Sequence, residues 1–241
     1  MLAFVGRIEW PDGWVENRVD GEKHDYCGVM GVYGVKDAAV VSWLGLHALQ
    51  HRGQESAGIV ASDGQKIRSH KGMGLLPQAV PSESLGDLPG HIAIGHVRYS
   101  TTGASKPQNI QPLVVDYSEG LIAIAHNGNL INARTLRDEY EAHGSIFQTS
   151  TDSEVIVHIM ARPENVARKN NIGHCLNSVK GAYCFLFMRE DRLIAARDPQ
   201  GFRPLCLGRL DEGYVVASES VAFDLIGAEM IREIEPGEMI T

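Results

Sequence analysis

The sequence has few cysteines and no excess of positive charge. Its four cysteines, Cys27, Cys175, Cys184 and Cys206, include no CxxC pair. Neither a zinc site built from close pairs nor the disulfide framework of a small secreted domain is therefore indicated. Acidic residues outnumber basic ones by 30 to 22, giving a net charge of -8. Because an acidic chain binds a phosphate backbone poorly, we expect no nucleic-acid partner.

The sequence also lacks targeting and membrane signals. No apolar run approaches the roughly 18 residues that a membrane helix needs. Residues 1–26 carry six acidic and three basic side chains, which fits neither a signal peptide nor a mitochondrial presequence. The ten histidines show no HExxH motif, and no phosphate-binding glycine loop is present, so we assign no metal or nucleotide site. We expect a cytoplasmic protein without membrane contacts.

The chain changes character at residue 27. Residues 1–26 mix charges and glycines without a sustained helix or strand period, which indicates a propeptide-like N-terminal arm, disordered or loosely docked. Hydrophobic residues make up 44% of the whole chain, as is usual for a folded protein. We expect the folded domain to span residues 27–241.

Apolar periodicity in residues 27–241 predicts strands and helices in blocks. Strands are expected at 27–35, 56–62, 91–98, 121–125 and 182–188, with a hairpin turn at Asp63-Gly64. Helices are expected from Asp37 to about Gln50, after Asn132, and after a capping box from Thr151 to Glu154. Blocks without strict βαβ alternation favour an α+β fold with mainly antiparallel sheets.

Cys27 stands where the arm meets the folded domain. By itself it is more commonly a small buried core residue. If the arm is removed after Tyr26, however, Cys27 becomes the N-terminal residue and carries both a thiol and an α-amine. An α-amine has an ordinary pKa of about 7.7–8.0, so it can act as the base for its own thiol.

Asn127-Gly128 follows an apolar strand. Such a pair usually forms a hairpin turn. The alternative is an oxyanion hole, formed by the Asn127 side-chain amide and the Gly128 backbone N–H, because glycine permits close backbone approach.

Two charged residues suit the two ends of an amino acid. Arg98 at a strand end is either a surface ion pair or a bidentate clamp for a carboxylate. Asp152, expected in the first turn of a helix, either complements the helix dipole or binds an ammonium group. Arg52-Gly53, near the end of the first helix, is either a simple C-cap or part of a site.

The order of these motifs resembles a known family. The segments CGVMGVYG, LQHRGQESAGI, GHVRYST, AHNGNL and TSTDSE resemble the class II glutamine amidotransferases, N-terminal-nucleophile hydrolases with a four-layer αββα fold. NIQPL, DPQGFRPL and EPGEM, with QHRGQE, are similar to the amidophosphoribosyltransferases among them. The resemblance runs from Cys27 to the end of the sequence.

The resemblance implies a role for each motif. Cys27 attacks the side-chain amide of glutamine after propeptide removal, while Asn127 and Gly128 stabilise the oxyanion. The remaining residues bind glutamine or line its site: Arg98, Asp152, Arg52, Gly53, Tyr99 and Thr101.

The resemblance also implies a partner domain. Ammonia is expected to pass to a phosphoribosyltransferase domain, whose motifs are absent from residues 1–241. There it converts phosphoribosyl pyrophosphate to phosphoribosylamine, the first step of purine biosynthesis. Full-length members use Mg²⁺ with phosphoribosyl pyrophosphate, some hold a 4Fe–4S cluster, and they form homo-oligomers, tetramers by resemblance. The isolated domain is expected to show glutaminase activity only.

Three other functions stay open on the sequence. They are the glutaminase domain of another transferase, such as a sugar-phosphate amidotransferase, an unprocessed or inactive amino-acid-binding module, and a structural domain whose motifs are only turns and caps.

Overall fold

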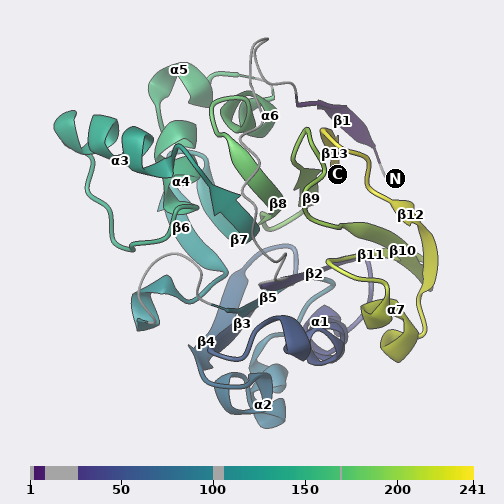
Figure 1. The fold of residues 1–241 in the computed structure, drawn as a ribbon. Helices are drawn as coiled ribbons and strands as arrows, with labels where there is room; N and C mark the ends of the chain where they lie inside the picture. Colours follow the sequence, from purple (N-terminus) through teal and green to yellow (C-terminus); the bar gives the residue numbers. More distant parts are fainter. Residues whose placement is uncertain (1–2, 9–26, 100–105, 169) are drawn as a thin grey trace.

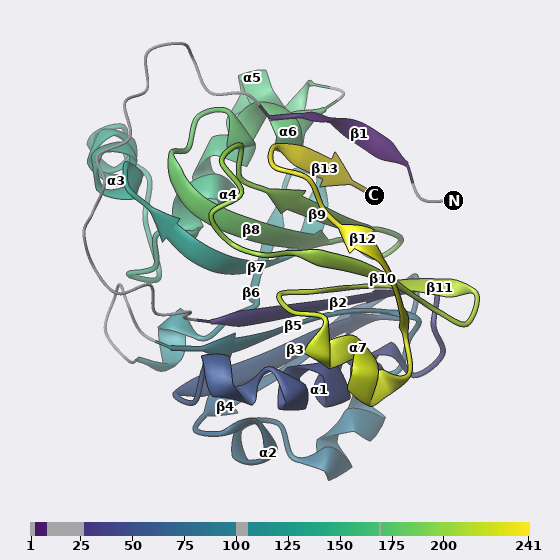
Figure 2. The ribbon, with the colours of Figure 1, turned by 45° about the vertical axis from the view of Figure 1, so that its right-hand side comes forward.

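The chain forms two antiparallel sheets that stack face to face, with helices on both outer faces (Figures 1 and 2). The computed structural model describes residues 3–8, 27–99, 106–168 and 170–241. Thr101, predicted to support the glutamine pocket, lies outside these residues. So does most of the N-terminal arm.

Within the described residues one sheet has six strands and the other seven. The first runs in the order β1 (Phe4–Arg7), β13 (Glu238–Ile240), β9 (Leu193–Arg197), β8 (Gly181–Met188), β7 (Gly120–Leu130) and β6 (Leu113–Tyr117). The second runs β12 (Glu229–Glu233), β10 (Cys206–Leu210), β11 (Gly213–Ala217), β2 (Gly28–Tyr33), β5 (Ile92–Arg98), β3 (Ser56–Ser62) and β4 (Ile67–Met73).

The helices form two outer layers. The seven-stranded sheet is covered by α1 (Ala38–Ala48), α2 (Leu76–Ala79) and α7 (Val221–Ile226). The six-stranded sheet is covered by α3 (Ala133–Ala142), α4 (Glu154–Met160), α5 (Pro163–Val166) and α6 (Asn171–Leu176). Short 3₁₀ helices occupy Gln50–Arg52, Ser82–Asp87 and Pro107–Asn109.

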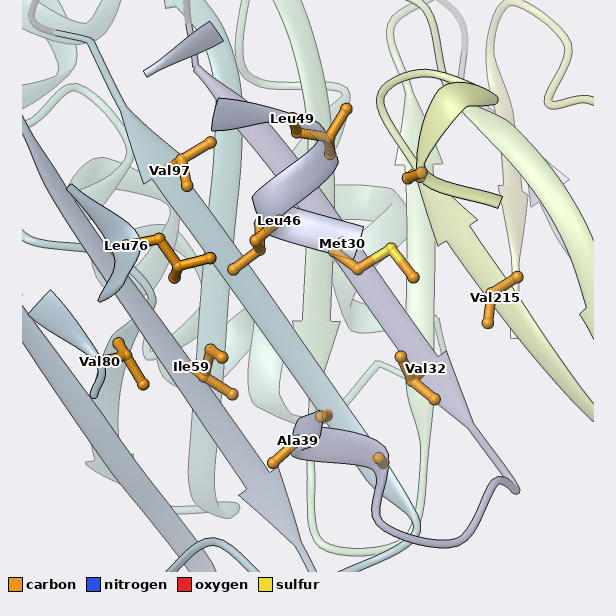
Figure 3. Packing of buried hydrophobic residues seen from close by; sticks show 14 of the residues in the cluster. Met30, Val32, Ala39, Leu46, Leu49, Ile59, Leu76, Val80, Val97 and Val215 are labelled. Atoms are coloured by element: carbon orange, nitrogen blue, oxygen red, sulfur yellow. The ribbon is translucent and has the colours of Figure 1, made fainter. Parts of the chain in front are cut away.

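Three apolar cores separate the four layers, which confirms the αββα prediction. One core lies between the seven-stranded sheet and its helices, where Leu46 of α1 lies beside Met30 of β2 (Figure 3). A second lies under α3 to α6, and a third fills the space between the sheets. Strands such as β8 are apolar on both faces because both faces are covered.

Residues 4–7 correct the expectation for the arm. Phe4–Arg7 form strand β1, which extends the six-stranded sheet beside β13, with Phe4 opposite Ile240. Ala3 and Thr241 exchange backbone hydrogen bonds of 2.7 and 3.0 Å, and Ile8 is buried. Four residues are too few for an alternation of apolar and polar side chains to be recognised in the sequence. The strand forms because β13 offers an unpaired edge to which it can hydrogen-bond.

Two helix starts differ from the local predictions. Asp37 precedes α1 as expected, but with no side-chain capping bond. The capping box at Thr151 does not form, because α4 begins at Glu154. The Glu154 carboxylate instead accepts hydrogen bonds from the backbone N–H groups of Gln148 and Thr149, each at 2.8 Å. It therefore fixes the loop before the helix.

Candidate active site

Cys27 directly precedes β2 and contacts Arg52 and Tyr99. Its backbone N–H donates to the Arg52 carbonyl at 2.9 Å, and its φ angle is 63°, in the left-handed region that side chains rarely adopt. Its Sγ contacts the Tyr99 carbonyl at 3.4 Å and the Tyr99 N–H at 3.5 Å. The nucleophile candidate is therefore held through both its backbone and its thiol.

Burial raises the pKa of the Cys27 thiol, and this outweighs the opposing effects of the Tyr99 hydrogen bond and the positive charge of Arg98. The sulfur is consequently protonated at neutral pH. Since the thiolate is the reactive form of a cysteine, a nucleophilic role for Cys27 would require a base that takes the thiol proton.

Arg52 is a buried part of this site, so the simple C-cap interpretation is wrong. Its side chain is 1% exposed, and Nε donates to the Cys27 carbonyl at 2.7 Å. Nη1 pairs with the carboxylate of Glu219, which also lies 3.1 Å from Nε2 of His51. Glu219 thus orients the guanidinium that holds the Cys27 backbone.

Gly53 allows two backbone segments to approach closely. A Cβ at this position would lie 2.6 Å from the carbonyl carbon of Arg98 and 2.7 Å from its N. Any larger residue would push β5 away from the 3₁₀ turn, so Gly53 lets Arg52 and Arg98 both lie near Cys27.

Asn127 and Gly128 lie inside β7, and the hairpin-turn interpretation is wrong. They pair with Cys184 and Tyr183 of β8, and the strand continues to Leu130. Gly128 has φ 155°, and a Cβ there would lie 2.0 Å from the carbonyl oxygen of Ala182. Only glycine fits at position 128, because β8 lies too close for a side chain and because the backbone conformation is one that other residues rarely adopt.

Asn127 reaches from one sheet to the other. Its side chain is completely buried, and its amide lies 3.3 Å from Oγ of Ser218 at the end of β11. Ser218 Oγ also accepts the N–H of Val29 in β2 at 2.9 Å. The candidate oxyanion donor is thereby connected to the strand that carries Cys27.

Arg98 and Asp152 both lie close enough to Cys27 to influence its thiol. Arg98, at the end of β5, is 4% exposed, so the surface-ion-pair interpretation is wrong. Asp152 precedes α4 instead of lying in its first turn, and its Oδ2 accepts the Leu130 N–H at 2.8 Å. The tertiary contact with β7 decides the orientation of this carboxylate.

Asp152 is ionised. Burial works against its charge, but nearby His126 and hydrogen bonds from the backbone of Leu130 and Ser153 hold its pKa below the usual range. His126 Nδ1 lies 3.5 Å from Asp152 Oδ1, and its ring stacks on Phe185 with centroids 4.4 Å apart. An acid–histidine pair therefore lies beside the candidate oxyanion hole.

Sequence reasoning missed Ser218, Glu219, His126 and His96. His96 in β5 is completely buried and bonds through Nε2 to the His126 carbonyl at 3.0 Å. The available signals were a histidine within each of the GHVRYST and AHNGNL motifs and a polar SES triplet after an apolar strand. None shows a function until the two sheets are stacked.

Tyr99 follows β5 and contributes its backbone to the thiol, while its side chain is 46% exposed. It therefore lies at the rim of the site, and its backbone contacts the candidate nucleophile.

The described residues include no group of three or more histidine, cysteine or acidic side chains suited to a metal ion. Cys206, Cys175 and Cys184 each belong to a different apolar core. These three thiols are too dispersed to ligate one iron–sulfur cluster. Among the helices that the structure describes, none is long and apolar enough to cross a membrane.

Comparison with known proteins agrees with this geometry. A family model described as a glutamine amidotransferase domain matches residues 96–224, more than half of the chain. The chain belongs to the glutamine amidotransferase family. Arg98, Asn127, Gly128 and Asp152 lie within the matched segment.

Amidophosphoribosyltransferases are among its close relatives. The Bacillus subtilis enzyme is 49% identical over 90% of this chain, and that of Methanocaldococcus jannaschii is 48% identical over 89%. A solved structure of glutamine phosphoribosylpyrophosphate amidotransferase from B. subtilis matches 88% of this chain with 49% identity and a TM-score of 0.83. This chain covers 46% of each of these three proteins, so it spans just under half of their length.

Proposed function

We propose that this chain is the glutamine-hydrolysing part of an amidophosphoribosyltransferase, with Cys27 as its nucleophile after removal of residues 1–26. Two observations support the proposal: Arg98 and Asp152 lie close enough to Cys27 to influence its thiol, and Asn127 is linked through Ser218 to Val29, two residues after Cys27. Sequence relatives of nearly 50% identity carry the name of that enzyme.

Removal of residues 1–26 turns the Cys27 amide into an amine. As a peptide nitrogen it donates to the Arg52 carbonyl at 2.9 Å and has no basic lone pair. As an α-amine it keeps that acceptor and gains the ability to take the thiol proton. The protonated thiol described above requires such a base.

The backbone at Cys27 also favours the cut. A φ of 63° costs about 1–3 kcal/mol in a residue with a side chain. This torsion contains the carbonyl carbon of the preceding residue. Once the bond after residue 26 is broken the torsion no longer exists, and the strain is released.

The reaction proceeds through a thioester. The α-amine takes the thiol proton as Sγ attacks the side-chain carbonyl carbon of glutamine. The Asn127 amide and the Gly128 N–H stabilise the resulting oxyanion. The C–N bond then breaks, the α-ammonium gives its proton to the leaving nitrogen, and ammonia departs. Water, deprotonated by the same amine, hydrolyses the thioester to glutamate and regenerates the thiol.

Glutamine is recognised at its other end. The planar guanidinium of Arg98 suits the α-carboxylate, and ionised Asp152 suits the α-ammonium group. Both lie in a buried environment, where charge pairs are screened little by salt. Tyr99 borders the entrance with its exposed ring, and Thr101 follows it in the sequence.

The lengths and names of the relatives suggest a consumer for the ammonia. The relatives are about twice as long as this chain, and one of the solved structures is named glutamine phosphoribosylpyrophosphate amidotransferase. We propose that a phosphoribosyltransferase domain receives the ammonia, with Mg²⁺ bound there, in a homo-oligomer. The dispersed cysteines described above do not fit a 4Fe–4S cluster within this domain.

The test combines mass spectrometry with a glutaminase assay. The chain is expressed whole and, separately, with Cys27 exposed as the first residue. We expect glutamine hydrolysis only where the N-terminus is Cys27, and its loss in Cys27→Ser. A glutamine-like diazoketone should add one label per chain, at Cys27. Activity in Cys27→Ser, or in a chain that still carries residues 1–26, would contradict the proposal.

Cys206→Ala is the matched control, because Cys206 is also a buried free thiol but lies in the core under α1 and α7. It should retain both activity and labelling.

A further inference from the structure

Ser218 has an arrangement that the proposed reaction does not yet explain. It follows β11 and is completely buried between the sheets. Its N–H donates to the Val29 carbonyl at 3.1 Å, and its Oγ accepts the Val29 N–H at 2.9 Å. Ser218 is thus hydrogen-bonded to both backbone groups of Val29, the second residue of β2. Its hydroxyl oxygen lies 3.3 Å from the Asn127 amide nitrogen.

The Asn127 amide can be placed in two orientations that differ only by exchange of its oxygen and nitrogen. In the first, Nδ2 donates to Ser218 Oγ. Oδ1 is then buried without a hydrogen-bond partner among the described residues. Both bonds at Ser218 Oγ are accepted ones, so the hydroxyl proton is not used by either neighbour.

The second orientation satisfies more groups. Ser218 Oγ still accepts the Val29 N–H and now donates its own proton to Asn127 Oδ1. This exchanges the bond from Nδ2 for one that joins the unpaired buried carbonyl to the unused hydroxyl. Only the Nδ2 hydrogens are then left without a partner, in place of the carbonyl, the hydroxyl proton and one Nδ2 hydrogen, which favours this state. In this orientation Nδ2 occupies the position that Oδ1 has in the first one, and it has no hydrogen-bond partner there among the described residues.

Only the second orientation suits an oxyanion. Nδ2 at the unpartnered position offers N–H to a developing negative charge, whereas Oδ1 there repels it. We propose that Ser218 is a positioning residue, whose hydroxyl selects the orientation of Asn127 that stabilises the oxyanion. This inference rests on the proposed glutaminase function.

The kinetic test compares Ser218→Ala, Ser218→Thr, Asn127→Ala and the double variant Ser218→Ala/Asn127→Ala. Ser218→Ala should lower kcat about tenfold, part of the 10²–10³ that a lost oxyanion donor costs, and leave KM within about twofold. Ser218→Thr keeps the hydroxyl and should restore kcat. The double variant should be no slower than Asn127→Ala, because Ser218 acts through Asn127.

Ser62→Ala is the matched control. Ser62 is also a completely buried serine that joins the two sheets, with Oγ donating to the Glu190 carbonyl at 2.6 Å. It lies at the other end of the strands, so its loss should lower Tm without changing kcat. A kcat unchanged in Ser218→Ala, or losses that multiply in the double variant, would overturn the proposal.

A neutron crystal structure provides a readout that does not depend on activity. In the deuterated chain, we expect the Ser218 hydroxyl deuteron to point at Asn127 and no Asn127 deuteron to point at Ser218. The opposite arrangement would overturn the inference. If the geometry is as expected but glutamine is not hydrolysed, it is the proposed function that fails.

Discussion

At one end of the stacked sheets buried polar side chains meet between the layers, and at the other end the same strands present mostly apolar ones. The polar end joins the sheets through His96 to His126 and through Asn127 to Ser218. The apolar end holds a cavity of about 110 Å³ between Leu193, Ala195 and Val216. Burying polar groups costs stability unless each finds a partner, so the apolar cores must offset what the site costs.

The comparison predicts that changes at the polar end affect the reaction or the stability in acid, whereas changes at the apolar end alter stability without altering the reaction. The following changes test that division, in order of decreasing effect.

Asn127→Ala should have the largest effect. Loss of one oxyanion donor lowers kcat by about 10²–10³, because the developing charge loses a preorganised partner. Steady-state kinetics of the chain that begins at Cys27 provides the measurement. A change confined to KM would exclude the oxyanion role.

His96 should make the polar end sensitive to acid. Burial lowers its pKa from 6.5 to about 3, so the folded state binds fewer protons than the unfolded state between these values. Stability is then lost as pH falls below 6.5, by about 1.4 kcal/mol per unit until pH 3. His96→Gln should reduce this slope in urea unfolding at a series of pH values.

His91→Gln is the control for this experiment, because His91 lies directly before β5 but is exposed. Equal slopes in the two variants would show that burial of His96 does not cause the acid sensitivity.

Arg98→Lys should raise KM for glutamine by about tenfold or more. An ammonium is a point charge and cannot reproduce the two parallel hydrogen bonds of a guanidinium to a carboxylate. kcat should change less than KM, because the α-carboxylate is remote from the reacting carbon. An unchanged KM would remove Arg98 from the substrate pocket.

Ala195→Val should have the smallest effect. Ala195 lines the apolar cavity, so added methyl groups fill empty space and should change stability by about 0.5–1 kcal/mol in the favourable direction. Activity should not change. Thermal unfolding and glutaminase kinetics together provide the measurement.

Ala196→Val is its counterpart. Ala196 is the next residue of β9, faces the packed core under α3 to α6, and has no free space, so overpacking should cost about 1–3 kcal/mol. Equal stabilities of the two variants would mean that the cavity is not the cause.

Local sequence patterns predicted the apolar strands, the helices after Asp37 and Asn132, and the motif residues of the site. They were wrong where a distant segment competes for the same polar group. The Asn127-Gly128 pair favours a turn by itself, but pairing with β8 extends the strand through it. The Thr151 box is lost because Glu154 binds the preceding loop.

The sequence by itself determined the two-sided apolar strands, the antiparallel class and the chemical groups available for glutamine. The tertiary structure decided which polar atoms meet. Asn127 and Ser218 are 91 positions apart, and Val29 and Ser218 are 189 apart. Periodicity reports which face of a strand is buried, but only the stacking of two sheets shows which buried donor meets which acceptor, because that depends on register between distant strands.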